Sequence, residues 1–256
     1  MAITDIIIGA GVKVGGGITV SNNGVITTGM VLGLDAANPR SYPGTGTTWY
    51  DLSGQENNAT MFGAVPNVYP YFDFSTVTGG SAGAASLGFT FASNMIPTTG
   101  SFTLSCWIKN PPAISQIGLF STAGGADGYR FGIGTTGVYT LMSGAGAVGY
   151  SEPNTNFLST LSSAVWYNVS MVYDRAGTFS SGTPQWQLYL NGTLQGTTNM
   201  GTPQTTAFTA VPPGIVRSAC CSLYTGQLST FYAYNRALSA TEVQQNFQAI
   251  RGRYGI

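Results

Sequence analysis

Histidine is absent from this 256-residue chain, and only 7% of the residues are charged. An average globular chain has roughly 25% charged residues. Without histidine, Ser-His-Asp and Cys-His catalysis are excluded, and zinc loses its commonest ligand. Nine basic and nine acidic residues cancel, and the basic residues form no run. Because nucleic-acid binding needs a basic patch, we expect no nucleic-acid partner.

Carboxylates are too few and too scattered for glycoside hydrolysis, which needs two of them facing each other across the scissile bond. The only glutamates are Glu56, Glu152 and Glu242, and none has an acidic partner at a suitable spacing. Glu242 is explained as a helix-capping residue, as described below. We therefore predict no catalytic residues and a chain that is not an enzyme.

Cysteine is also scarce, with three residues of which Cys220 and Cys221 are adjacent. Cys106 alternates with apolar residues, so we expect it to point into a core as a small hydrophobic group. Three free thiols in a reducing compartment are favoured over a disulfide between Cys106 and one of the pair. That alternative stays open on the sequence alone.

No apolar run is long enough to cross a membrane. Near the N-terminus Asp5 stands where a signal peptide would carry positive charge, and glycines interrupt the apolar residues that follow. We therefore expect neither a signal peptide nor a membrane partner.

What the chain does have is hydrophobic residues (43%), aromatic residues (12%) and 36 glycines. This apolar content favours a packed core over disorder. The length suits one large all-β domain. Strand-like alternation recurs, with turn signals about every ten residues, which is typical of a β-sandwich or barrel. The clearest strand segments are Met30–Leu34, Ser101–Ile108, Trp166–Tyr173, Trp186–Leu190 and Leu228–Tyr234.

Two of these strands indicate which face is buried. Alternation in Ser101–Ile108 points four side chains to one side: Phe102, Leu104, Cys106 and Ile108. Alternation in Trp166–Tyr173 does the same with Tyr167, Val169, Met171 and Tyr173. Asn191-Gly192 between two apolar segments predicts a hairpin turn of a primed type. Within these strands, three tryptophans are interpreted as packing residues: Trp107, Trp166 and Trp186.

A single convincing helix is predicted near the C-terminus. Ser239 is its N-cap, and Glu242 three residues later completes a capping box. Leu238 and Val243 stand at the positions of a hydrophobic staple. One apolar face continues through Val243, Phe247 and Ile250.

Residues 1–29 are predicted to form an N-terminal hairpin arm, followed by one domain over residues 30–256. Ile18–Val20 and Val25–Thr27 flank a turn signal at Asn23-Gly24. Ahead of the hairpin, Ile6–Ile8 is an apolar segment that needs to be covered. A two-stranded hairpin is marginal by itself, so it must lie on its own domain or on a neighbouring subunit.

Loops with oxygen-bearing side chains raise the question of calcium. Asp and Asn also form turns with their own backbone, and no EF-hand spacing is present. We therefore favour turns over a structural calcium ion and predict neither a metal site nor a cofactor. The residues concerned are Asp35, Asn38, Asp51 and Asn58.

Aromatic residues in or near loops are candidates for stacking on a sugar or for burial in a protein interface, where Tyr and Trp dominate the binding energy. The candidates are Tyr42, Trp49, Tyr50, Tyr129, Tyr139 and Tyr150. No ligand-binding residue is assigned among them. Met142–Tyr150 is interpreted as a glycine-rich loop, and it is not a phosphate cradle because no helix follows.

Four segments in order resemble the concanavalin A-like lectin and glucanase superfamily, which includes laminin-G-like domains: Ser101–Trp107, Trp166–Asp174, Leu188–Gly192 and Tyr234–Glu242. The resemblance implies an all-β jelly-roll sandwich of two antiparallel sheets, with the short C-terminal helix packed at their edge. Glucanases of this superfamily carry the motif Glu-x-Asp-x-x-Glu in one strand, and this chain has no such motif.

A narrower resemblance is to laminin-G-like structural proteins of tailed bacteriophages, such as those of cyanobacterial hosts. It lies in Leu34–Gly44, Thr48–Gly54 and Gln245–Gly255. It implies a virion protein that decorates or cements the capsid, with the major capsid protein or tail proteins as partners and homo-oligomers as the expected state. The alternative is a lectin module of the tail or tail fibre that binds a host surface polysaccharide. The chain lacks the coiled coil or triple helix of a free-standing fibre stalk.

Overall fold

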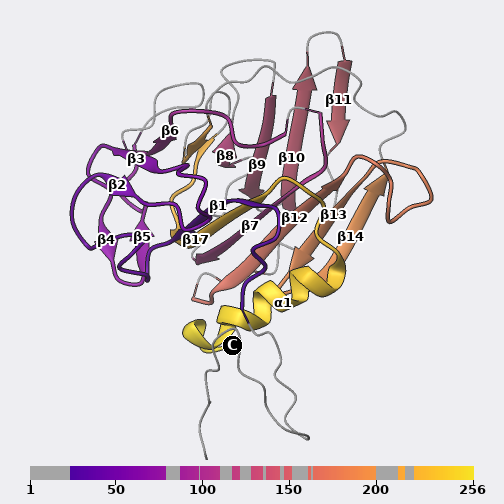
Figure 1. The fold of residues 1–256 in the computed structure, drawn as a ribbon. Coiled ribbons are helices and arrows are strands. Elements are labelled where there is room, and N and C mark those ends of the chain that lie inside the picture. Colours follow the sequence, from indigo (N-terminus) through magenta and orange to yellow (C-terminus); the bar gives the residue numbers. More distant parts are fainter. Residues whose placement is uncertain are drawn as a thin grey trace, which may run out of the picture.

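The computed structural model describes residues 24–78, 87–97, 99–109, 117–121, 128–134, 137–144, 147–151, 161–162, 164–199, 213–216 and 222–256. These residues form two β-sheets and one α-helix, followed by a short 3₁₀ helix (Figure 1). The predicted all-β, two-sheet antiparallel sandwich with one short C-terminal helix is confirmed. Within the described residues, no helix has the length and apolar character needed to span a bilayer.

The first sheet has the strand order β14-β13-β12-β7-β17-β5-β4, and β1 pairs with β17. Its pairings are all antiparallel. The strands are β14 (Thr193–Asn199), β13 (Gln185–Leu190), β12 (Tyr167–Asp174), β7 (Phe102–Lys109), β17 (Gln227–Tyr234), β5 (Tyr71–Asp73), β4 (Asn67–Val68) and β1 (Met30–Asp35).

The second sheet has the order β11-β10-β9-β8-β15-β6-β3-β2, and β16 adds a two-residue parallel pairing to β8. Its strands are β11 (Ala147–Ser151), β10 (Gly137–Gly144), β9 (Gly128–Gly134), β8 (Ile117–Ser121), β15 (Gly214–Ile215), β6 (Gly88–Phe91), β3 (Ala59–Phe62), β2 (Thr48–Trp49) and β16 (Ser222–Leu223). The five strand segments predicted from alternation correspond to β1, β7, β12, β13 and β17, all in the first sheet.

The main core lies between the two sheets and contains the predicted inward faces of β7 and β12. Cys106 is fully buried there as a free thiol, as expected for a small core residue, and burial raises its pKa well above the usual range. Cys220 and Cys221 lie outside the described residues. Trp186 is also in this core, where its ring packs against Tyr173 and Phe102, so its predicted packing role is confirmed.

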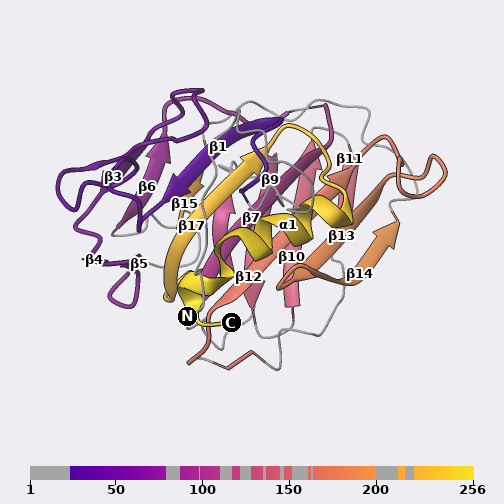
Figure 2. The ribbon, with the colours of Figure 1, turned by 60° about the horizontal axis from the view of Figure 1, so that its bottom comes forward.

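The α-helix α1 (Ala240–Ile250) lies across the outer face of the first sheet, and η2 (Arg251–Tyr254) follows it (Figure 2). The expectation of a helix at the sheet edge is therefore wrong. The reason is that β12, β13 and β17 carry apolar side chains on their outer face as well. These side chains need a cover, and they form a second buried cluster with the helix: Val172, Tyr189, Tyr232, Tyr234, Leu238 and Val243.

The predicted helix start is confirmed in detail. Ser239 is the N-cap, its Oγ accepts from the Glu242 backbone N–H, and a Glu242 carboxylate oxygen accepts from the Ser239 N–H at 2.9 Å. Leu238 and Val243 are both buried in the second cluster, as the staple predicts. Phe247 is buried and stacks on Trp107 of β7, which confirms Trp107 as a packing residue.

The hairpin between β13 and β14 is also confirmed. Asn191 and Gly192 both have positive φ, 49° and 74°, as a type I′ turn requires. Gly192 sits against α1, because a Cβ there would collide with the Gln244 side chain and approach Phe247. The turn is thus pressed onto the helix.

Of the predicted N-terminal hairpin arm, only residues 24–29 lie within the described part of the chain. Ile6–Ile8 and residues 18–23 lie outside the described residues. Val25–Thr27, predicted as the second hairpin strand, forms no strand in the structure. Val25 and Ile26 instead pack against the second cluster beside α1, which satisfies their need for apolar cover. The boundary between arm and domain at residues 29 and 30 stays a prediction.

Candidate binding surface

The four oxygen-bearing candidates for calcium are engaged in hydrogen bonds within the protein. Asp35 accepts from the Ala37 N–H at 2.9 Å and pairs with the Arg253 guanidinium at 2.7 and 3.0 Å. Asn38 accepts from the Arg40 N–H at 3.0 Å. Both are the local turns that Asp and Asn form with their own backbone.

Asp51 is the most heavily bonded of the four. Its Oδ1 accepts from the N–H groups of Gly33 and Ser53, and its Oδ2 from the Ser53 hydroxyl and the Asn57 N–H. Asn58 accepts from the Asp51 N–H at 2.9 Å. These bonds are what the turn interpretation predicts. Within the described residues, no group of three or more acidic or cysteine side chains is arranged to hold a metal ion.

Two of the aromatic candidates for ligand stacking prove to be core residues. Trp49 is fully buried between Phe72 and Phe89, with ring centroids 4.7 and 5.1 Å away. Tyr42 is 7% exposed, packs on Phe72, and donates its hydroxyl to the Gly46 carbonyl at 3.0 Å. Tyr50, with 45% exposure, presents its side chain to solvent as predicted.

The remaining aromatic candidates lie in strands of the second sheet: Tyr129 in β9, Tyr139 in β10 and Tyr150 in β11. Met142–Tyr150 is not a loop, because most of it belongs to β10 and β11, which pair with each other. Glycine content misled the prediction here. An antiparallel pair accepts glycines when the neighbouring strands supply the hydrogen bonds.

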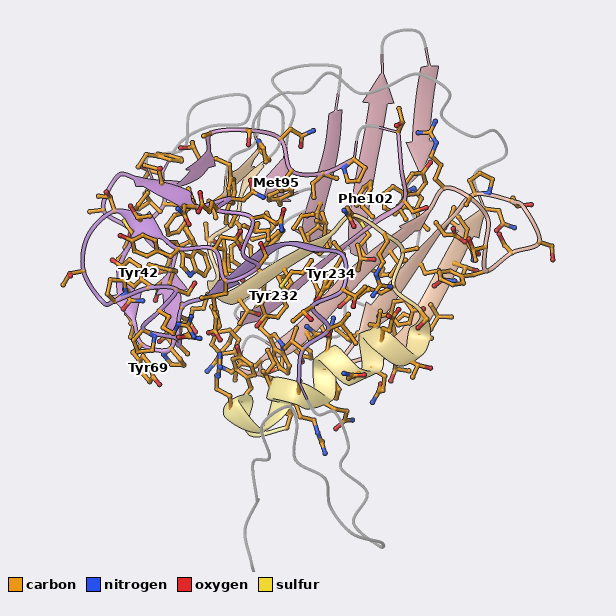
Figure 3. All side chains as sticks on the ribbon, in the orientation of Figure 1. Tyr42, Tyr69, Met95, Phe102, Tyr232 and Tyr234 are labelled. Carbon is orange, nitrogen blue, oxygen red and sulfur yellow. The ribbon has the colours of Figure 1, made fainter. Side chains whose placement is uncertain are left out.

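Aromatic side chains gather elsewhere, on the outer face of the first sheet near the C-terminus. We define the aromatic surface as Tyr69, Tyr71, Val165, Trp166 and Tyr254. The Tyr71 and Trp166 rings lie 5.6 Å apart, and the Trp166 and Tyr254 rings 5.0 Å apart. Tyr69 is 74% exposed and Val165 is 37% exposed. Figure 3 shows Tyr69 at the lower left edge of the molecule, below Tyr42.

The floor of the aromatic surface is Trp107, which is fully buried. Tyr254 stacks on it with a centroid distance of 4.0 Å and an interplanar angle of 16°. Trp107 Nε1 and the Oγ1 of Thr230, its cross-strand neighbour on β17, are buried without a hydrogen-bond partner. Trp166 lies just before β12 and is only partly buried. Its predicted place inside a strand is therefore wrong by one residue, and it packs on Tyr71 and Tyr254.

Three distant segments are held together to build this surface. The Ser229 hydroxyl donates to the Pro70 carbonyl at 2.6 Å, and the Tyr254 hydroxyl donates to Ser229 Oγ at 2.9 Å. The Asp35–Arg253 ion pair fixes η2 beside them. Burial is the main cause that raises the pKa of Tyr254 to about 12, so its phenol is neutral and donates at physiological pH.

The chemistry of the aromatic surface suits binding rather than catalysis. Its rings offer flat apolar faces, and its polar groups are neutral hydroxyls and indole N–H groups. None of its five residues carries a carboxylate, amine or thiol for acid–base work. Sequence reasoning did not assign Tyr69, Tyr71 or Tyr254. Tyr69-Pro70-Tyr71 was a visible aromatic signal, but nothing local placed it beside residues 166 and 254.

Comparison with known proteins identifies the family. A model of the concanavalin A-like lectin/glucanases superfamily matches residues 80–244, which is more than half of the chain. A comparison with curated proteins gives no match. Eight similar solved structures share 12–16% sequence identity with this chain, so they show the fold alone.

Among them is domain 4 of the arabinanase AbnA from Geobacillus stearothermophilus, in complex with arabinotriose (TM-score 0.59, 12% identity, 85% of this chain and 97% of that one). The receptor binding domain of botulinum neurotoxin C/D mosaic serotype gives a TM-score of 0.64 at 14% identity, over 87% of this chain and 52% of that one. Trypanosoma rangeli sialidase gives a TM-score of 0.58 at 16% identity, over 89% of this chain and 34% of that one. The chain thus spans about half of the toxin binding domain. It belongs to the concanavalin A-like lectin/glucanase superfamily.

Proposed function

We propose that this chain is a non-enzymatic binding module of a tailed-phage virion, and that it decorates or cements the capsid surface. The observation that carries the binding role is the aromatic surface. Tyr69 is 74% exposed there, two residues before Tyr71, whose ring contacts Trp166 in the group of rings built on Trp107. Large aromatic side chains on a preformed support supply much of the binding energy of protein interfaces.

A non-enzymatic role is supported by how three of the nine acidic residues are used. Glu242 is bonded to Ser239 and Arg236, Asp35 to Arg253, and Asp51 to its own loop. Each of these carboxylates already has a structural partner. General acid–base catalysis instead needs a carboxylate held within reach of a substrate.

The virion role rests on the sequence resemblance and is supported by how its segments pack. The segment Leu34–Gly44 contacts both of the others, Thr48–Gly54 and Gln245–Gly255. The Ser41 hydroxyl donates to the Tyr50 carbonyl at 2.6 Å, and Arg253 pairs with Asp35. The three segments therefore form one structural unit next to the aromatic surface. A surface with few charges is also easier to desolvate against neighbouring proteins.

The second candidate function is a receptor-binding lectin module of the tail or tail fibre. The exposed Tyr69 ring favours it, since the flat face of an aromatic ring can stack on the apolar face of a sugar. One solved structure with this fold is a domain in complex with arabinotriose, and others are receptor or toxin binding domains. In this reading the same aromatic surface binds a host polysaccharide.

Copy number on the particle separates the two functions. Quantitative mass spectrometry of purified virions, relative to the major capsid protein, gives hundreds of copies for a decoration protein and tens or fewer for a tail component. Cryo-electron microscopy of the same particles then locates the protein. Density on the tail alone would overturn capsid decoration.

A point variant tests whether the aromatic surface makes the contact. Tyr69→Ala should abolish or strongly weaken attachment to particles that lack this protein, because Tyr69 has the most exposed ring of the surface. Tyr50→Ala is the matched control, since it removes a solvent-exposed tyrosine outside the surface. Equal attachment of both variants would show that the partner binds elsewhere.

A further inference from the structure

Residues 24–29, which we call the N-terminal strap, lie against α1 and the end of β17. Their backbone is held by groups from residues 234–246, more than 200 positions away in the sequence. The bonds are Gln245 Nε2 to the Gly24 carbonyl (2.9 Å), the Ile26 N–H to Asn246 Oδ1 (2.8 Å), the Tyr234 hydroxyl to the Ile26 carbonyl (3.1 Å), Arg236 Nε to the Thr28 carbonyl (3.0 Å) and the Asn235 N–H to the Gly29 carbonyl (2.9 Å).

This arrangement is a slot that recognises a peptide backbone. Four of its five contacts come from side chains, and no β-ladder is formed. Asn246 and Tyr234 are almost fully buried and also bond to each other, Nδ2 to hydroxyl, at 3.0 Å. If the strap left, these buried polar groups would lose partners, which is costly. The slot therefore needs a backbone in it.

Apolar contact adds to the hydrogen bonds. Val25 and Ile26 are partly buried against the second cluster, which contains Tyr234 and Val243. Both side chains keep some exposure, so the strap is attached at the surface and not interwoven with the core. Such a peripheral segment can detach without unfolding the sandwich.

A single turn makes the docking intramolecular. The Met30 N–H donates to the Thr27 carbonyl at 3.0 Å, and Gly29 has a φ of +75°. An added Cβ on Gly29 would lie 3.0 Å from side-chain atoms of Arg236 and Asn235, so the closed turn requires glycine. Beyond it, β1 stays paired with β17 whichever way the strap runs. Opening this turn redirects the strap and leaves the sheet intact.

We propose that the slot is an interface between copies of this chain, in which it binds residues 24–26 of a second copy. The exchanged residues make the same three hydrogen bonds, through the Gly24 carbonyl and the Ile26 N–H and carbonyl, and the same apolar contacts through Val25 and Ile26. The two states therefore differ mainly in the turn at residues 27–30, which gives up its bonds to Arg236 and Asn235 when it opens. Copies fixed side by side raise the effective concentration of each other's straps, which favours exchange. The inference rests on the proposed function in one respect only, which is that a virion surface would hold copies of this chain side by side.

Disulfide trapping in the purified full-length chain tests the exchange. Two variants with one introduced cysteine each, Gly24→Cys and Gln245→Cys, are made with Cys220 and Cys221 replaced by serine, and the buried Cys106 is kept. The Gln245 side chain reaches the Gly24 carbonyl at 2.9 Å, and an added Cβ on Gly24 meets no atom within 4 Å. After co-expression and mild oxidation, we expect covalent heterodimers whose yield rises with concentration.

The matched control is Gln248→Cys, on an exposed position of the same helix. Paired with Gly24→Cys, it should give at least several-fold less heterodimer. Equal yields would indicate random collision and overturn the proposal. So would a chain carrying both Gly24→Cys and Gln245→Cys that forms only intramolecular cross-links at every concentration.

A variant without introduced cysteines provides a second measurement. Gly29→Ala strains the closed turn and should raise the dimer fraction several-fold in sedimentation velocity. A variant that remains as monomeric as the wild type would contradict exchange through this turn. Both experiments use purified protein alone, so their failure leaves the copy-number test of the proposed function intact.

Discussion

Glu242 connects the start of α1 to the end of β17, and its replacement by glutamine provides a sharp test of the energetics. Its carboxylate accepts two hydrogen bonds from Arg236, at 2.7 and 2.9 Å, and one from the Ser239 N–H. Arg236 in turn donates to the Thr28 carbonyl of the strap. One negative charge thus contributes to the capping box and the ion pair, and positions the arginine that holds the strap.

The pKa of Glu242 predicts how this contribution depends on pH. The hydrogen bonds from Arg236 are the main cause that lowers the pKa from 4.5 to about 2, although burial opposes them. Because the pKa is lower in the folded state, the stabilisation is present above pH 4.5 and is lost as pH falls towards 2. The two side chains are 28–30% exposed, so solvent screening reduces the full linkage energy to about 1–2 kcal/mol.

Urea unfolding followed by tryptophan fluorescence measures the effect. At about pH 7, Glu242→Gln should unfold with a free energy about 1–2 kcal/mol below that of the wild type, and by about pH 2.5 the difference should largely vanish. Glu56→Gln, which changes an exposed glutamate, should match the wild type throughout. If Glu242→Gln lowers the free energy of unfolding by the same amount at both pH values, the ion-pair reasoning is refuted.

Three further predictions concern the core, the thiol and a turn. Trp49→Ala should cost about 3–5 kcal/mol in urea unfolding because Trp49 is fully buried, whereas Tyr50→Ala next to it should cost less than about 1 kcal/mol. Cys106 should resist alkylation in the native state and react once urea is added, as mass spectrometry of the peptide would show, because burial raises its pKa. Native labelling would contradict its place in the core. Asp51→Ala should destabilise by about 2–3 kcal/mol, since it leaves several loop N–H groups unpaired, and added calcium should not shift its melting temperature or that of the wild type; a calcium-dependent rise would revive the metal hypothesis.

Short-range patterns in the sequence correctly predicted several elements. The helix start needed only Ser239, Glu242 and the staple residues, because a capping box closes within four residues. The turn at Asn191-Gly192 needed only the positive φ that these residues tolerate. Alternation in β7 and β12 identified the inward faces, because successive side chains of a strand point to opposite sides.

Short-range sequence patterns failed where the burial or pairing of a residue depended on distant segments. Tyr42 and Trp49 were placed on the surface because turn-forming residues surround them, yet they pack on Phe72 and Phe89 from other strands. The glycine-rich stretch from Met142 looked like a loop because its own residues cannot reveal the pairing partner.

The sequence by itself determined the all-β class, the position of the helix and the absence of histidine chemistry, because composition and short-range periodicity encode these properties. Only the tertiary structure decided that α1 covers the outer face of the first sheet, that Tyr71, Trp166 and Tyr254 meet on that face, and that the strap is held by residues 234–246. The physical reason is that burial is settled by which surfaces meet in space. Contacts between residues about 90 to 220 positions apart leave no periodic signal in either segment.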